Sequence, residues 1–212
     1  EAADFLSASA HKIHGPKGVG LLCARRPEAA DALILGGGQE GGLRSGTENT
    51  PGIAGFGTAA EEAAAALPQA AEHVARVRAR LLAGIVDGIP DIRIVSPEKA
   101  ATDGHPGCCS PYILSVSFLG TRGEVLLHGL ESVGIHVSTA SACASIGRAG
   151  RGGPGAKNAK SHVLAAMGIP DREAEGVLRF SFSRHNTMEE MDCVTERLKD
   201  AVGRFRKIGS FR

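Results

Sequence analysis

The stretch that decides the fold is Ser7-Ala8-Ser9-Ala10-His11-Lys12-Ile13-His14-Gly15-Pro16-Lys17-Gly18, in which a lysine follows a short strand-like segment and precedes a glycine–proline turn. Taken alone, Lys12 is most simply a surface lysine in a β-turn. A lysine that reacts covalently needs an uncharged amine and a rigid position beside its partner. The turn after Lys12 can supply that rigidity, and the hydroxyls of Ser7 and Ser9 can bind a phosphate.

A second frame, Ser138-Thr139-Ala140-Ser141-Ala142-Cys143-Ala144-Ser145, surrounds a cysteine with small residues. A lone cysteine is usually a buried small residue, but this frame has no apolar bulk to bury, so both interpretations stay open. Arg148 and Arg151 follow closely and would favour the thiolate if they lie beside it. A covalent lysine and a nucleophilic thiol in one chain together suggest pyridoxal phosphate chemistry on sulfur.

A rival interpretation of the first frame is a glycine loop that binds a nucleotide phosphate. Its glycine spacing matches neither the Walker nor the Rossmann pattern, which disfavours that interpretation. Arg179 is the charged residue inside the apolar run 177–182. A half-buried arginine normally has an anionic partner, which here is either a substrate carboxylate or a structural carboxylate. The glycine-rich stretch 35–49 either offers hydrogen-bond donors to an anion or is a turn-rich connecting loop with no binding role.

Composition excludes several classes of protein. The 212 residues are 42% hydrophobic, enough for one large domain or two small ones. A net charge of +1 creates no field that favours nucleic acid or a membrane surface, and no apolar run is long enough to span a bilayer. Five irregularly spaced cysteines argue against a disulfide framework, and without a Cys-x-x-Cys pair we predict no metal site. Reduced thiols predict a cytoplasmic protein.

The hydrophobic pattern alternates between strand and helix, which predicts an α/β fold. We expect a cap at Thr50, an interruption at Pro68, a capping box over Thr187–Glu190 and a mobile basic loop over 147–160. The composition shift around residues 66–68 predicts two domains, 1–66 and 67–212. The expected strands cover 2–7, 19–24, 92–95, 113–118, 135–138 and 177–182, and the expected helices cover 54–66, 69–86, 122–133, 161–168 and 187 to about 205.

Five motifs occur in order, and together they identify a family resemblance. They are Ser-x-Ser-x-His-Lys-x-x-Gly-Pro-Lys-Gly, Gly-Gly-Gly-Gln-Glu…Arg-Ser-Gly-Thr-Glu-Asn, Ser-Ala-Cys-x-Ser, Ser-His-Val-Leu-x-Ala-Met-Gly and Leu-Arg-Phe-Ser. In this order they closely resemble the cysteine desulfurases of the NifS/IscS type, in the class V aminotransferase family; selenocysteine lyases look similar. The resemblance implies the aspartate aminotransferase-like fold type I of pyridoxal phosphate-dependent transferases. Residues 1–66 would be the last part of its large domain, and 67–212 its α+β small domain.

The resemblance also implies how the cofactor is held. Lys12 would be the Schiff-base lysine and would move protons on the substrate. Ser9 and His11 would bind the cofactor phosphate. Thr47 would reach that phosphate in the other subunit of a homodimer.

For the substrate, the resemblance implies that Arg179 holds the carboxylate of L-cysteine. Cys143 would attack the substrate sulfur, which yields L-alanine and a persulfide on Cys143. The sulfur would then pass to an acceptor protein such as an iron–sulfur scaffold.

Two departures from the family pattern bear on these expectations. Family members are about twice this long, so we expect the beginning of the protein to be absent here. The absent half would carry the aromatic group that stacks on the cofactor ring and the aspartate that holds its ring nitrogen. The chain by itself would then be a non-catalytic fragment or partner. In addition, Glu40-Gly41-Gly42 stands where the family usually has Glu-Arg-Gly.

Overall fold

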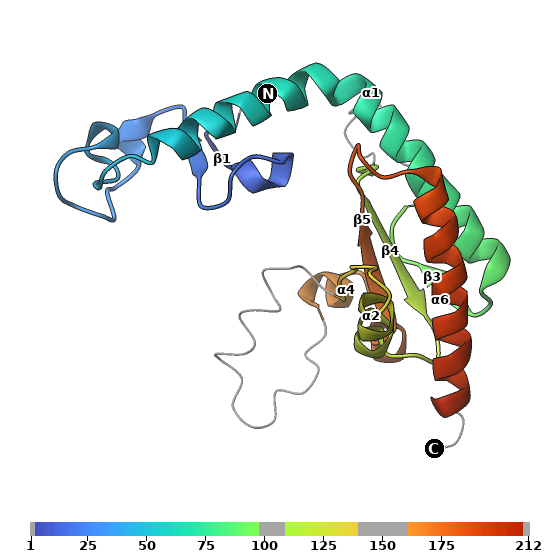
Figure 1. Cartoon of the computed structure of the whole chain (residues 1–212). Coiled ribbons are helices and arrows are strands. Elements are labelled where there is room, and N and C mark those ends of the chain that lie inside the picture. Colours follow the sequence, from blue (N-terminus) through green and yellow to red (C-terminus); the bar gives the residue numbers. More distant parts are fainter. Residues whose placement is uncertain (1–2, 98–108, 140–160, 210–212) are drawn as a thin grey trace. The chain divides into compact units, whose positions relative to one another are not determined.

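The computed structural model in Figure 1 describes residues 3–97, 109–139 and 161–209. The chain divides into two compact units, Glu1–Leu67 and Pro68–Arg212. This division lies next to the boundary expected from composition, while the roles expected for the two parts stay predictions. Cys143 and the loop predicted over 147–160 lie outside the described residues.

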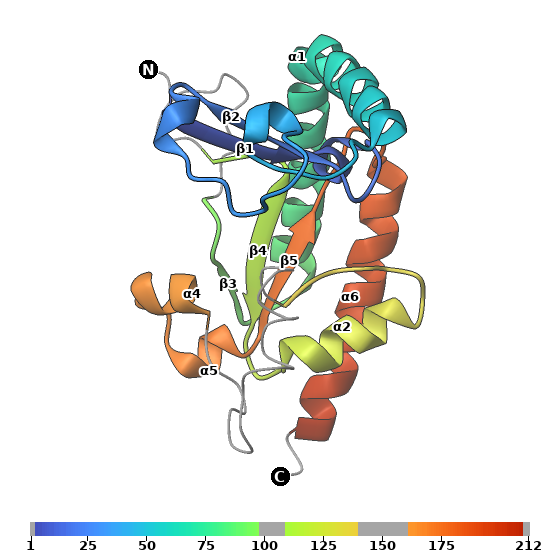
Figure 2. The ribbon, with the colours of Figure 1, turned by 90° about the vertical axis from the view of Figure 1, so that its left-hand side faces the viewer.

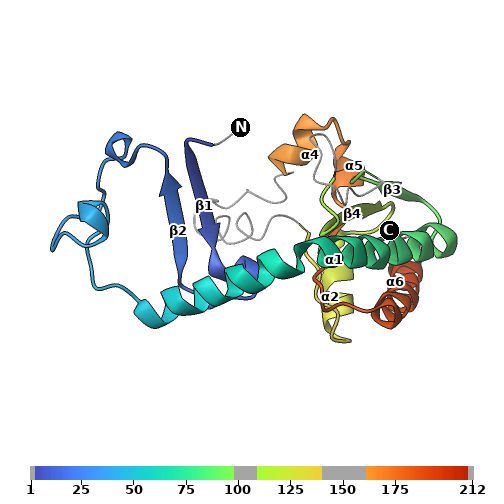
Figure 3. The ribbon, with the colours of Figure 1, turned by 90° about the horizontal axis from the view of Figure 1, so that it is seen from above.

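The first unit is built on an antiparallel hairpin of β1 (Phe5–Ser9) and β2 (Gly20–Ala24), with Ser7 opposite Leu22. The 3₁₀ turn η1 (Ala10–Ile13) lies between the two strands, and η2 (Pro27–Ala29) and η3 (Glu40–Gly42) follow β2. Figure 3 shows the hairpin with the first part of helix α1. Both strands were expected from the apolar pattern, and both are confirmed.

Both faces of this hairpin carry exposed apolar side chains. Phe5 is 48% exposed on one face, and Leu6 is 54% exposed on the other. Leu22, which shares the face of Phe5, is 62% exposed. An isolated two-stranded sheet is marginally stable in water, and strands apolar on both faces are typical of a sheet covered on both sides.

Helix α1 (Thr50–Gly88) begins in the first unit and ends in the second. The expected interruption at Pro68 is wrong, because Pro68 lies inside one continuous helix. Proline removes one backbone hydrogen bond, and the alanine-rich flanks have the propensity to continue the helix across it. The expected cap is also wrong. Asn49, rather than Thr50, accepts the backbone N–H of Gly52 through Oδ1, at 3.2 Å.

The second unit has a three-stranded antiparallel sheet in the order β3 (Ile92–Ile94), β4 (Ile113–Phe118), β5 (Val177–Ser181). Helices α1, α2 (Gly123–Glu131) and α6 (Met188–Gly209) contribute to the core with one face of this sheet, as Figures 1 and 2 show. The core side chains alternate along the strands, as Leu114, Val116 and Leu178 do, and they pack with Leu81 of α1 and Leu198 of α6; all five are almost completely buried.

Glycines allow two of these helices to approach α6 closely. A Cβ atom on Gly84 of α1 would lie 2.6 Å from Thr195 Oγ1, and one on Gly129 of α2 would lie 2.9 Å from Phe205 Cε2. Both distances are shorter than van der Waals contact. The sequence pattern predicted the helices, but only the packing explains these two glycines.

The other face of the sheet is more polar. It carries Arg93, Ser115, Ser117 and Arg179, of which Arg93 pairs with Glu173 of the short helix α5 (Asp171–Ala174). Helix α4 (His162–Ala166) supplies Leu164 to a small apolar cluster with Ile169 and Val177. Helix α4 was expected, whereas α5 was not, because four residues carry no periodic signal.

The strand expected over 135–138 is wrong. Only Ser138 pairs with β5, in an isolated bridge to Arg179. Ile135 and Val137 instead pack against the main core cluster. The burial of these two side chains therefore takes the place of further strand pairing with β5.

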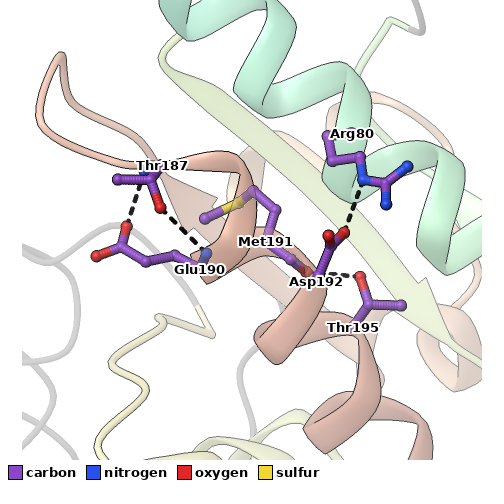
Figure 4. Close-up of polar contacts among 6 residues, drawn as sticks. All are labelled: Arg80, Thr187, Glu190, Met191, Asp192 and Thr195. Atoms are coloured by element: carbon purple, nitrogen blue, oxygen red, sulfur yellow. Dashed lines mark hydrogen bonds and ion pairs between the residues drawn. The ribbon is translucent and has the colours of Figure 1, made fainter.

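The capping box expected at the start of α6 is confirmed. Glu190 donates its backbone N–H to Thr187 Oγ1 at 3.2 Å, and the Glu190 carboxylate accepts the backbone N–H of Thr187 at 3.1 Å. Figure 4 shows this reciprocal pair beside the ion pair between Arg80 and Asp192, whose atoms Nε and Oδ1 lie 2.6 Å apart.

The capping box makes the stability of α6 dependent on pH. Hydrogen bonds from the Asn186 side chain and the Thr187 backbone lower the pKa of the Glu190 carboxyl. A lowered pKa in the folded state stabilises the fold above the unfolded value of about 4.3, and this contribution is lost as pH falls through the folded value. We expect Glu190→Gln to lower the thermal midpoint at about pH 7 and much less at about pH 3. Glu196→Gln is the control on the same helix, and an equal loss at both pH values would contradict the prediction.

Candidate active site

Lys12 lies in η1, the turn directly after β1, and its side chain is exposed. Backbone hydrogen bonds close this turn on both sides, from Ala10 N–H to Val19 O at 3.1 Å and from Gly15 N–H to Ala10 O at 2.9 Å. His14 adopts a left-handed conformation with φ of 67°. The amine of Lys12 therefore extends from a closed turn.

The turn is also held against α1. A Cβ atom on Gly15 would lie 3.0 Å from Ala10 Cβ and 3.2 Å from Ala59 Cβ. One on Gly55 would lie 2.7 Å from Pro16 Cγ. The Gly15–Pro16 dipeptide thus fits between the strand end and the helix, and this packing gives Lys12 the rigid position that covalent chemistry needs.

Ser9 and His11 flank this lysine, and both are exposed. Their hydroxyl and imidazole groups can donate hydrogen bonds to a phosphate. The structure thus brings Ser9, His11 and Lys12 together within one turn of the first unit.

Thr47 follows a glycine-rich loop that is closed on itself. Ser45, which is buried, donates its backbone N–H to Ile34 O at 3.1 Å, and Gly46 N–H donates to Gln39 Oε1 at 3.0 Å. Thr47 itself is exposed. No hydrogen bond among the described residues joins Thr47 to the turn of Lys12.

Arg179 occupies the middle of β5, on the polar face of the sheet. Its neighbours along the strand, Leu178 and Phe180, point into the core. The Nε atom of Arg179 is buried and has no hydrogen-bond partner among the described residues. Leaving a buried donor unsatisfied costs about 1–3 kcal/mol, and more when the group is charged. This guanidinium is therefore suited to bind an anion.

Two neighbours of Arg179 were not expected from the sequence. Ser115 is its partner in β4, and Ser138 is its partner on the opposite edge of β5. Residues directly opposite in antiparallel pairs share a face, so a serine flanks Arg179 on each side. The alternation of Ser115 and Ser117 along β4 is the signal that could have indicated this polar face.

The protein-family comparison matches residues 2–194 to the family described as aminotransferase class-V. The cysteine desulfurase IscS of Clostridium botulinum is 40% identical over 205 residues, which are 97% of this chain and 48% of the relative. Cysteine desulfurase IscS 1 of Archaeoglobus fulgidus is 39% identical over 97% of this chain and 49% of its own.

Solved structures agree with these relatives. A NifS-like protein has a TM-score of 0.76 at 37% identity, covering 94% of this chain and 46% of that one. The NifS-like protein from Rickettsia africae has a TM-score of 0.73 at 26% identity, covering 93% and 47%.

The fold is thus that of an α/β protein similar to the NifS-like proteins, which confirms the expected fold class. The chain belongs to the class V aminotransferase family, whose members depend on pyridoxal phosphate. It spans about half the length of the curated relatives it matches. Among the described residues, no helix combines the length and the apolar character that crossing a membrane requires.

Proposed function

We propose that the complete protein is a cysteine desulfurase, which converts L-cysteine to L-alanine and transfers the sulfur to Cys143. The observation that carries this proposal is the Nε atom of Arg179, buried and without a hydrogen-bond partner among the described residues, in a chain that matches cysteine desulfurases over 97% of its length. An amino-acid substrate would bring a carboxylate to this guanidinium.

The donors of the first unit fit pyridoxal phosphate. Lys12 offers an amine to the aldehyde, and Ser9 and His11 offer donors to the phosphate. When bound, the cofactor supplies an electron sink that activates the α and β carbons of an amino acid. Lys12 holds the cofactor and moves the proton at the substrate α carbon. The backbone hydrogen bonds that close the turn hold the main chain on either side of Lys12.

Arg179 would bind the substrate carboxylate through its planar fork, which recognises carboxylates with two parallel hydrogen bonds. This fixes the orientation of the amino acid. Cys143 would then attack the substrate sulfur as a thiolate, so that a sulfur–sulfur bond forms as the carbon–sulfur bond breaks. The electron pair of that bond passes to the β carbon, which takes up a proton on the way to alanine.

The proposed partners are a second copy of the chain and a sulfur acceptor such as an iron–sulfur scaffold. Leu33 is 93% exposed and Leu35 is 81% exposed, directly before the glycine-rich loop that leads to Thr47. Apolar side chains this exposed are typical of a surface that a partner covers. In a homodimer, Thr47 would then reach the cofactor phosphate of the other subunit. Cytoplasmic location stays a prediction.

The test is to supply the complete protein with pyridoxal phosphate, L-cysteine and a dithiol reductant, which reduces the persulfide and releases its outer sulfur as sulfide, and to measure alanine and sulfide. We expect both products in equal amounts, and a complete protein that binds the cofactor but forms neither would overturn the proposal. The relative turnover of cysteine and selenocysteine tests the alternative that the protein is a selenocysteine lyase.

A second candidate function is that the 212-residue chain by itself is a non-catalytic fragment or partner chain. The exposed Phe5, Leu6 and Leu22 favour it, because a two-stranded sheet with apolar faces is incomplete as a cofactor-binding support. We expect this chain alone, after it is mixed with pyridoxal phosphate and purified from the unbound cofactor, to show little visible absorbance from bound cofactor.

A further inference from the structure

The side of Arg179 that faces β4 carries a hydroxyl group that the proposed roles do not use. Ser115 of β4 is the register partner of Arg179 in β5, and Figure 2 shows these two strands side by side. Ser115 is half-buried, and its Oγ atom has no hydrogen-bond partner among the described residues. Ser117, by contrast, donates its hydroxyl to the backbone oxygen of Glu173. The hydroxyl of Ser115 is therefore available for another contact on this face of the sheet.

The hydrogen-bond pattern of the sheet brings the side chains of Ser115 and Arg179 close together. Phe182 donates its N–H to Tyr112 O at 2.9 Å, and bonded pairs alternate with non-bonded pairs along an antiparallel ladder. Ser115 and Arg179, three positions along, are therefore a non-hydrogen-bonded pair, and the backbone of Arg179 accordingly bonds to Ser138 on its other side. In such pairs the Cα atoms lie about 4.5 Å apart and the side chains are at their closest.

The main chain of Ser115 is fixed from the side opposite Arg179. Its N–H donates to Ser96 Oγ at 2.8 Å, and its carbonyl oxygen accepts the N–H groups of Val95 at 2.9 Å and of Ser96 at 3.1 Å. Because both backbone groups are used on that side, the hydroxyl is the polar group that Ser115 can offer to Arg179. The hydroxyl oxygen turns about a single side-chain torsion, which has three staggered positions.

The guanidinium of Arg179 has one enclosed nitrogen and two open ones. Nε is buried and has no hydrogen-bond partner among the described residues. The two terminal nitrogens also lack a partner among those residues, but they are not buried. Glu173, a carboxylate on the same side of the sheet, is paired with Arg93. A carboxylate that arrives from solvent therefore meets the terminal nitrogens, whereas Nε needs an acceptor that already lies within the sheet.

We propose that Ser115 is a positioning residue, whose hydroxyl oxygen accepts the Nε–H of Arg179. This hydrogen bond fixes the plane of the guanidinium, so that its two terminal nitrogens stay directed toward a carboxylate. The role of Ser115 rests on the proposed function, because the carboxylate is taken to be that of the amino-acid substrate. A guanidinium that is already fixed loses less side-chain entropy on binding, so Ser115 raises the affinity for a carboxylate without touching it.

The first test follows the Nε–H signal of Arg179 by nuclear magnetic resonance in the 212-residue chain. The signal is assigned by its loss in Arg179→Lys, because lysine has no such group. We expect Ser115→Ala to move the signal upfield, as loss of a hydrogen-bond acceptor does, and Ser115→Thr, which keeps the hydroxyl, to retain its position. Ser117→Ala is the matched control on the same strand and face. It removes the bond to Glu173 O, so it should lower the thermal midpoint and leave the Nε–H signal unchanged.

The second test uses acetate as the probe for a carboxylate. Its dissociation constant is obtained from the backbone signals of residues 178–180 in the same chain. We expect Ser115→Ala to weaken acetate binding about fivefold, the cost of ordering one long side chain, and Ser115→Thr to stay within about twofold. In the complete protein, Ser115→Ala should raise KM for L-cysteine by a similar factor and leave kcat within about twofold, because the carboxylate is held alike before and during the reaction.

The outcomes separate this role from that of Arg179. If Arg179→Gln weakens acetate binding but Ser115→Ala leaves either the Nε–H signal or the acetate affinity unchanged, the positioning role is overturned and the role of Arg179 stands. If Arg179→Gln binds acetate as tightly as the unsubstituted chain, both roles are overturned. If Ser115→Thr acts like Ser115→Ala, the size of the side chain rather than its hydroxyl matters, and the proposal fails.

Discussion

Replacing Lys12 with alanine in the complete protein is expected to lower the rate of alanine formation from L-cysteine by about 10²–10⁴-fold, the usual contribution of a positioned proton-transfer group. On the proposed roles of Lys12, loss of the amine would remove both the covalent hold on the cofactor and the group that moves the substrate proton. Alanine formation is followed by amino-acid analysis, and cofactor binding by visible absorbance.

Lys17→Ala is the matched control for this prediction. Lys17 is exposed, lies five residues later in the same hairpin connection, and follows Pro16, which packs against Gly55. We expect Lys17→Ala to retain activity within about threefold, as expected for an exposed side chain outside the site. Equal losses in the two variants would show that the charge of the hairpin, rather than Lys12, matters.

Replacing Cys143 with serine is expected to abolish the release of sulfide and alanine while cofactor absorbance is retained. A hydroxyl is a far weaker nucleophile than a thiolate at neutral pH, so under the proposed mechanism the sulfur would have no acceptor on the enzyme. This separation of binding from turnover distinguishes the variant from Lys12→Ala, which should lose both. The assay measures alanine, sulfide and visible absorbance on the same sample.

Cys193→Ser is the control for this second prediction. Cys193 is an exposed free cysteine on α6 and its loss should leave turnover unchanged. Retained desulfuration in Cys143→Ser would overturn the assignment of Cys143 as the sulfur acceptor. Loss in both variants would indicate that the two thiols act together.

Prediction from sequence worked where a local pattern decides the structure. The strand 113–118 alternates apolar and serine residues, and the structure has β4 at those residues. The capping box over Thr187–Glu190 forms as expected, because its two hydrogen bonds join residues three apart. Such features depend on neighbours in the chain and need no knowledge of the fold.

Prediction failed where a distant contact outweighs the local pattern. Pro68 was expected to interrupt α1, yet the helix continues to Gly88, where Leu81 and Ile85 are buried in the core. The segment 135–138 reads as a strand, but Ile135 and Val137 pack against the core and only Ser138 pairs. At 135–138 burial of apolar side chains against the core contributes more than the local strand preference, whereas at Pro68 the alanine-rich flanks offset the loss of one backbone hydrogen bond.

The sequence by itself determined the family and the candidate chemistry, because five motifs in order identify a lysine, a thiol and an arginine of distinct kinds. The tertiary structure decided how these residues are held. It closed the turn of Lys12 against α1, left Nε of Arg179 buried without a partner among the described residues, and joined Ser138 to Arg179 across the edge of β5. The physical reason is that side-chain packing and unsatisfied hydrogen-bonding groups depend on residues far apart in the chain, which only the folded structure brings together.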